Sequence, residues 1–225
     1  NPTKMSWDWT KAGKMKDGKP YSEKGPFGKP VYKSIKGAFT WEKDVVPDYY
    51  WFNGSIGSTT IVDTIDPAQT VKVSYPVGER KDPEARIFPF KTHDGVQPYD
   101  KINKKLVAPL LSGPNGYWTT FDMNDAIARG HKFVGVPYSG EFDYVNTTYV
   151  YPITHMVAPK EKAVACTECH RRENSRLANI ANIYMPGKHR NNLFDTFGWL
   201  TVIGAMIGVG LHGAGRLFTR NGRED

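Results

Sequence analysis

Cys166-Thr167-Glu168-Cys169-His170 is the stretch on which the fold and function of this chain depend. Two cysteines two residues apart, followed at once by a histidine, form the pattern of c-type haem attachment. Each thiol adds to one vinyl group of the porphyrin, and the two-residue gap spans the distance between the vinyls. His170 is then held under the ring, where its imidazole can bind the iron as the proximal ligand.

Other uses of the two cysteines are less well supported. A structural zinc site needs four nitrogen or sulfur ligands, and the chain has only two cysteines. A redox Cys-x-x-Cys motif normally begins a helix in a strand–helix–strand setting, which is not visible around Cys166. A disulfide or redox pair is the remaining alternative to haem attachment.

The composition limits the classes of partner. The chain has 225 residues, enough for one or two domains plus an extra element. Its 30 basic and 23 acidic residues give a net charge of +7, but no compact basic run is interleaved with aromatics, so we expect no nucleic-acid partner. Haem is attached covalently outside the cytoplasm. We therefore expect either that an export signal once preceded Asn1 or that Asn1 is not the native N-terminus.

The first half of the chain predicts an α+β fold with short strands, much irregular loop and Pro/Gly-rich wrapping. Residues 1–30 are rich in Gly, Lys and Pro and predict an extended arm that docks through Trp7 and Trp9, or otherwise a loose polar tail. Residues 31–190 are expected to form the extracytoplasmic haem c-binding domain. Alternating aromatics near residue 40 predict strands, and Asn53-Gly54 predicts a turn.

Short helices are expected in the second half. Residues 120–130 predict a helix with Thr120 as N-cap and Gly130 as C-cap candidate. Residues 144–151 are β-branched and aromatic. Apolar residues at intervals of three predict a modest amphipathic helix over 175–183 within the haem-binding segment.

The C-terminal region predicts one transmembrane helix over residues 191–218. Residues 197–218 are nearly all apolar or glycine, and about twenty residues at 1.5 Å each span the hydrocarbon core of a bilayer. A buried helix of a soluble protein is the alternative.

Orientation follows from charge and from the haem. Arg216, Arg220 and Arg223 favour a cytoplasmic tail over residues 219–225, although Lys188 and Arg190 on the other flank weaken this rule. The haem decides the question, because it places Cys166 outside the cytoplasm. We expect a single-pass protein of the bacterial inner membrane with its bulk in the periplasm.

Gly204, Gly208 and His212 lie four residues apart on one face of the predicted helix. Small residues let a second helix approach closely, and a histidine at membrane depth is a candidate for function. We expect a membrane-protein partner on this face, with His212 ligating a b-type haem or touching a quinone. The alternative is a helix-packing hydrogen bond.

The remaining histidines matter because an electron-transfer haem needs a second axial ligand, commonly His or Met. His155 and His93 are the main candidates, and Met185 is another. His131 lies just past the expected helix end and is interpreted as a helix-end charge partner. A histidine in a loop is otherwise an ordinary polar residue.

Several longer motifs resemble the C-terminal half of octahaem tetrathionate-reductase-like cytochromes c. The resemblance runs from about residue 1 to 175. It implies bis-histidine haems stacked as a wire, with His93 and His155 as distal ligands. It also implies a haem-rich N-terminal half that carries the other CxxCH motifs and the catalytic haem. The motifs are residues 36–42 (KGAFTWE), 50–54 (YWFNG), 88–93 (FPFKTH), 97–100 (QPYD), 137–140 (PYSG) and 154–161 (THMVAPKE), followed by CTECH.

The chain departs from this pattern in two ways. It has one CxxCH motif, so further haems c are expected in a missing N-terminal half or on another polypeptide. Its apolar C-terminal segment implies docking to a membrane partner. We expect an electron-transfer module working with a quinone or b-type partner. The alternatives are part of a reductase acting on tetrathionate, nitrite or hydroxylamine, and a structural membrane anchor.

Overall fold

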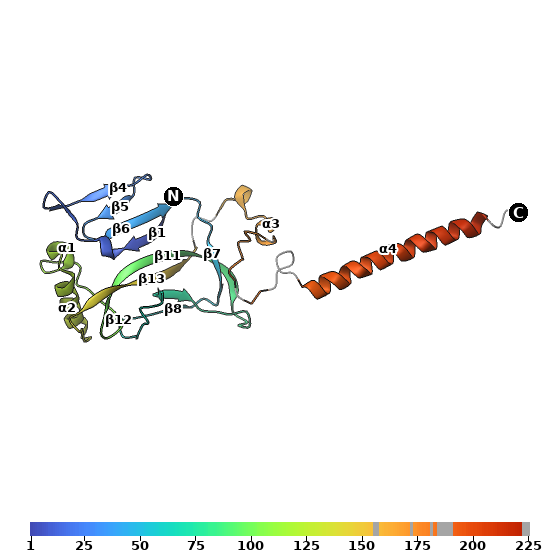
Figure 1. Ribbon diagram of the computed structural model, residues 1–225. Coiled ribbons are helices and arrows are strands. Elements are labelled where there is room, and N and C mark those ends of the chain that lie inside the picture. Colours follow the sequence, from blue (N-terminus) through green and yellow to red (C-terminus); the bar gives the residue numbers. More distant parts are fainter. Residues whose placement is uncertain (155–157, 172, 181, 184–190, 222–225) are drawn as a thin grey trace. The chain divides into compact units, whose positions relative to one another are not determined.

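A computed structural model describes residues 1–154, 158–171, 173–180, 182–183 and 191–221. The chain forms two compact units. The first comprises Asn1–Ala163 and Arg176–Asn182, and the second comprises Val164–Ser175 and Ile183–Asp225. The mixed α/β content agrees with the expected fold class: many strands, short helices and one long apolar C-terminal helix (Figure 1).

The first unit is built on a nine-stranded mixed sheet with the order β4-β5-β6-β1-β11-β13-β9, to which β7 and β12 add by pairing with β11. Two further pairs, β2–β3 and β8–β10, form small separate sheets. The bounds are β1 Thr3–Asp8, η1 Trp9–Lys11, β2 Met15–Lys16, β3 Lys19–Pro20, β4 Ser22–Lys24, β5 Pro30–Lys33, β6 Gly37–Glu42, β7 Asp48–Phe52, β8 Ile56–Ser58, β9 Val71–Lys72, β10 Ser74–Pro76, β11 Arg86–Asp100, β12 Lys105–Leu106, α1 Tyr117–Thr120, α2 Met123–Val134, β13 Phe142–Pro152 and η2 Lys160–Lys162.

Strand β11 is 15 residues long and runs through the middle of the sheet. Its residues 90–100 pair with β13 along one edge, while β7, β1 and β12 share the other edge. His93 therefore lies within a continuous strand. The strand's two prolines are tolerated because Pro98 lies where the partner changes from β1 to β12, and Pro89 lies where β13 ends.

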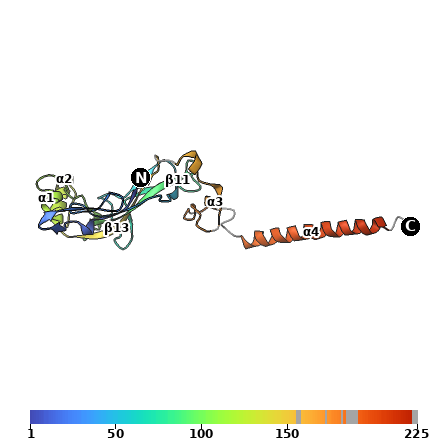
Figure 2. The ribbon, with the colours of Figure 1, turned by 90° about the horizontal axis from the view of Figure 1, so that it is seen from above.

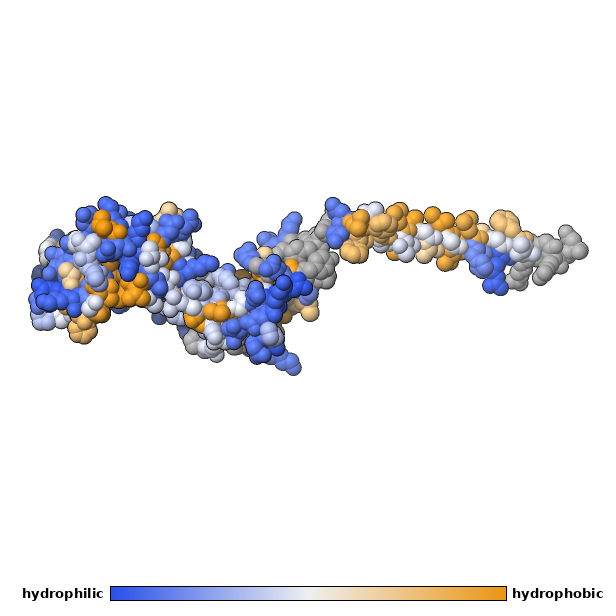
Figure 3. Space-filling view, turned by 90° about the horizontal axis from the view of Figure 1, so that it is seen from below, coloured by the Kyte–Doolittle hydropathy of each residue, from blue (hydrophilic) through white to orange (hydrophobic). Residues whose placement is uncertain are grey.

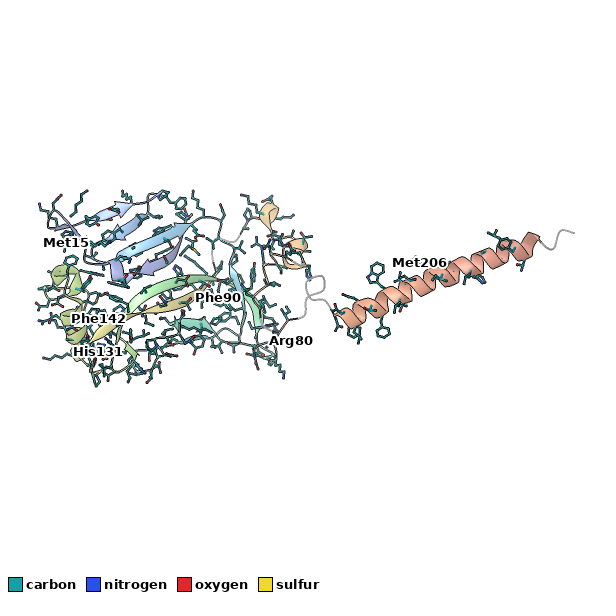
Figure 4. The ribbon with its side chains drawn as sticks, viewed as in Figure 1. Met15, Arg80, Phe90, His131, Phe142 and Met206 are labelled. Atoms are coloured by element: carbon teal, nitrogen blue, oxygen red, sulfur yellow. The ribbon has the colours of Figure 1, made fainter. Side chains whose placement is uncertain are left out.

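Aromatic side chains fill one face of this strand. Phe90 is fully buried, and its ring lies 5.1 Å from Phe52, 5.7 Å from Tyr50 and 5.8 Å from Phe88 (Figure 4). Edge-to-face pairs at these centroid distances add to the free energy gained by burying the rings. The cluster fixes β11 against β7 and leaves the alternate residues, His93 among them, on the opposite face.

The N-terminal residues join the sheet. Strand β1 lies between β6, to which it is antiparallel, and β11, to which it is parallel. Trp7 stacks on Trp9 with ring centroids 5.0 Å apart, and its indole N–H donates to the Lys36 carbonyl at 2.6 Å. The two indoles are therefore half-buried and held by specific contacts.

Two helices replace the single helix expected over 120–130, and α1 and α2 lie at one end of the sheet (Figures 1 and 2). Thr120 ends α1, and Phe121 adopts a left-handed conformation that separates the helices. The N-cap of α2 is Asp122, whose carboxylate accepts the Asp125 N–H at 3.0 Å. Gly135, with φ of 72°, ends the helix, so the proposed caps Thr120 and Gly130 were both wrong.

The second expected helix, over 175–183, is also absent from the described residues. Residues 176–179 form a turn instead. Ile180 is buried, but with only three apolar positions the segment has too little apolar surface to stabilise a helix of its own. The β-branched and aromatic stretch 144–151 lies in β13, and Asn53-Gly54 lies in the connection between β7 and β8, with Gly54 at φ of 97°.

The second unit holds α3 (Cys166–Cys169) and α4 (Asn192–Asn221). Over Asn192–Thr219, α4 is long and apolar enough to cross a membrane, and none of its apolar window is buried. Figure 3 shows this apolar surface along the helix, with hydrophilic residues toward both ends. Phe197, Trp199 and Leu200 on this helix are all exposed.

Replacing Gly130 by alanine tests the packing of α2. A Cβ at this position would lie 1.8 Å from the Ala108 carbonyl oxygen, which is backbone and cannot turn aside. In an open position of a helix, alanine stabilises the helix by about 1 kcal/mol relative to glycine. We expect Gly130→Ala instead to lower the free energy of unfolding by about 1–3 kcal/mol, measured by denaturant unfolding. Increased stability would contradict the packing of α2 on residue 108.

Candidate functional site

The CTECH stretch forms a single helical turn. In α3 the two cysteines are three residues apart and therefore lie on the same side of the turn. The His170 N–H donates to the Cys166 carbonyl at 2.8 Å, and His170 then leaves the helix with φ of −91° and ψ of 63°. The Ser175 hydroxyl donates to the Cys169 carbonyl at 2.6 Å and so holds the end of the turn.

The state of the sulfur atoms fits covalent attachment of a porphyrin. Neither cysteine is in a disulfide; Cys166 is exposed and Cys169 is partly buried. His170 is exposed next to them. In the described part of the chain, no group of three or more His, Cys, Asp or Glu residues is placed to hold a metal ion, so the motif finds no further zinc ligands there. The thiols and imidazole can accept haem without breaking an existing bond.

His93 lies in the first unit, in the middle of β11. Its side chain is 5% exposed, although its strand neighbours are polar. The imidazole is stacked on the Tyr149 ring, with centroids 5.5 Å apart and planes inclined by 7°, and meets the Tyr151 ring edge-on at 5.3 Å. The Nδ1 atom is buried and has no hydrogen-bond partner within the described residues.

The electrostatics around His93 keep its imidazole neutral. Burial is the main cause that lowers its pKa from 6.5 to about 4, and the charges of Lys91 and Lys4 lower it further. A neutral imidazole is the form that binds a metal. The Nδ1 atom, unpaired among the described residues, is itself buried, and a buried polar atom without a hydrogen-bond partner costs free energy.

His131, by contrast, is structural. It lies within α2 and is 2% exposed, so the interpretation as a charge partner just beyond a helix end was wrong. Its Nε2 accepts the Ala108 N–H at 3.2 Å, and its Nδ1 lies 3.2 Å from the carbonyls of Val136 and Pro137. The imidazole thus ties α2 to the loop at residue 108 and to the loop that follows the helix.

The remaining predicted site residues are His155, Met185 and three residues of α4. His155 and Met185 lie outside the described residues. His212 is on α4 with Gly204 and Gly208, where a Cβ on either glycine would meet nothing within 4 Å. The functional roles of all three α4 residues stay predictions.

Comparison with known proteins identifies the class of this chain. The model of the family "Cytochrome c bacterial" matches residues 4–173. The crystal structure of octaheme cytochrome c from Shewanella oneidensis matches with a TM-score of 0.69 and 40% sequence identity, covering 76% of this chain. This chain spans 39% of that protein's length. A search of curated proteins gave no match.

The family match extends over the sheet and through the CTECH motif, and both comparisons agree with the resemblance that the sequence motifs carry. They imply covalently bound haem c. The chain therefore belongs to the bacterial cytochrome c family.

Proposed function

We propose that this chain is a membrane-anchored electron-transfer module of a multi-haem array. The observation that carries the proposal is the α3 turn, which presents two free thiols and His170 in a chain of the cytochrome c family. Cys166 and Cys169 form the thioethers, and His170 is the proximal ligand. The bound haem supplies a one-electron Fe(III)/Fe(II) couple.

The protein's own contribution is to hold the haem in place and to exclude water from its ligands. Two thioethers fix the porphyrin at α3, where the hydrogen bond from Ser175 restrains the carbonyl of Cys169. His93, and His155 by the family resemblance, complete the iron coordination of haems in the array as distal ligands. Those further haems are carried by an N-terminal half or by another polypeptide. The aromatic neighbours of His93 exclude water from its ring.

The long apolar helix supports the membrane part of the proposal. We assign α4 as a single-pass anchor in the bacterial inner membrane, with the sheet in the periplasm and the C-terminus in the cytoplasm. A membrane protein with a quinone or b-type haem packs on Gly204, Gly208 and His212. Electrons pass between that partner and the haem array.

Changing His170 to alanine tests the proximal ligand. The thioethers do not depend on this residue, so we expect covalently bound haem to be retained. The optical spectrum of one haem should change, because its iron loses an axial nitrogen. Thr167→Ser, within the same turn, should leave the spectrum as in the unaltered protein. A His170→Ala spectrum identical to the parent's contradicts the assignment.

Changing His93 to alanine tests the distal ligand. We expect one haem of the complex to become high spin by electron paramagnetic resonance, since loss of an axial imidazole weakens the ligand field. The control is Thr92→Ala, which alters the next residue on the opposite face of β11. Retention of every low-spin signal in His93→Ala would remove His93 from the ligand set.

Ending the chain at Asn191 tests the anchor. A helix that crosses the bilayer is held there by about twenty apolar residues, so we expect the truncated protein to move from the membrane fraction to the soluble periplasmic fraction. Arg216→Gln, which keeps the helix, should stay in the membrane. A truncated chain that remains membrane-bound in the absence of its partners would show that α4 is not the anchor.

A further inference from the structure

One face of the central sheet gathers basic and aromatic side chains around His93. The register places Phe39 beside Trp7, Trp7 beside Gly95, and Gly95 beside Thr147 across β6, β1, β11 and β13. Because side chains alternate along a strand, residues at even spacing share this face. His93 and Lys91 therefore lie on it with their cross-strand neighbours Tyr149 and Tyr151, and Lys4 lies on it opposite Trp41.

Lys4 and a second lysine, Lys36, are held over aromatic rings. The Lys4 Nζ lies 4.9 Å from the centroid of Trp7 and 5.4 Å from that of Phe39. The Lys36 Nζ lies 5.8 Å from the centroid of Trp7 and 5.2 Å from that of Trp118. Two ammonium groups thus share one indole, and cation–π contacts fix their positions.

These positive charges have no acidic partner in the part of the chain that the structure describes. Among the described residues, an ion pair joins Arg129 to Asp125 on α2, and none joins Lys4, Lys36 or Lys91 to a carboxylate. Partial burial lowers the pKa of Lys4, and repulsion from Lys36 and Lys91 lowers it further. Like charges gathered beside a buried imidazole cost free energy unless an anion joins them.

The chemistry of that anion follows from His93. A ligand that brings an iron to His93 and carboxylates to nearby ammonium groups is a haem, whose two propionates lie on one edge of the ring. Lys91 is two residues from His93 on the same face of β11, or about 7 Å along the strand. Lys4 lies on the neighbouring strand β1 and is near enough for its charge to act on His93.

We propose that Lys4 and Lys91 bind the propionate carboxylates of the haem whose iron is ligated by His93. This inference rests on the proposed role of His93. The two ammonium groups neutralise the two carboxylates through charge-assisted hydrogen bonds, and the Tyr149 ring holds the imidazole plane by stacking. The sheet face is then a preformed binding site for a haem that is covalently attached elsewhere in the assembly.

The test uses the complete haem-loaded complex, with haem that carries ¹³C in its propionate carboxylates. Lys4→Met and Lys91→Met each remove one charge and keep an unbranched side chain, and Lys132→Met on the exposed part of α2 is the matched control. Redox-difference infrared spectra report the labelled carboxylates. Potentiometric titration followed optically reports the midpoint of each haem.

We expect the labelled carboxylate bands to shift in Lys4→Met and Lys91→Met and to stay unchanged in Lys132→Met. The midpoint potential of one haem should fall in both, because losing a nearby positive charge favours the ferric state. Haem content should be unaffected.

Three results would overturn the inference. Unchanged labelled bands and midpoints, with His93→Ala still producing a high-spin haem, would keep His93 as a ligand but exclude Lys4 and Lys91 as partners of the propionates. Shifts confined to unlabelled protein carboxylate bands would assign the lysines to an acidic segment of a partner polypeptide. Retention of all low-spin haems in His93→Ala would show that His93 is not an iron ligand, and the propionate-binding site proposed beside it would then be wrong as well.

Discussion

The pairing of β11 with β13 is the interaction on which the first unit depends. Residues 90–100 of β11 face residues 142–152 of β13 without a break in register, and the other edge of β11 is shared by three different strands. A one-residue slip would exchange the two faces of the strand. Phe90 would leave its aromatic cluster, and His93 would lose its stacking partner Tyr149.

This division of faces explains how one strand serves both stability and function. Around Phe90, one face of β11 is apolar and buried, and its ring cluster holds β11 and β7 together. The His93 face carries a buried imidazole with an unpaired nitrogen and lysines without acidic partners among the described residues. Such a face is unfavourable by itself, which is the usual mark of a surface shaped for a ligand.

The haem motif was predictable from sequence, because covalent chemistry fixes the spacing of Cys166, Cys169 and His170. The apolar helix was predictable because its length must match a bilayer. The setting of His93 was not: Pro89 and Pro98 resemble loop signals, and their tolerance depends on which strands pair at those points. The parallel pairing of β1 with β11, across some 90 residues of chain, leaves no local signal either.

The helix caps of α2 show a further limit. Thr120 and Gly130 have the right residue types for caps, but Asp122 and Gly135 take those positions. The choice is made by packing, because Gly130 must lie against the backbone of Ala108 and His131 must reach the loops on either side. Tertiary contacts of this kind override local preference and are invisible in a single sequence.

The central claim is that the α3 turn carries a haem through two carbon–sulfur bonds. Mass spectrometry of the proteolytic peptide that contains Cys166–His170, from protein purified with its haem intact, tests it most directly. We predict one porphyrin adduct on this peptide, with fragment ions that assign it to both cysteines. A peptide that carries no adduct, with its two cysteines as thiols or as a disulfide, would contradict the account.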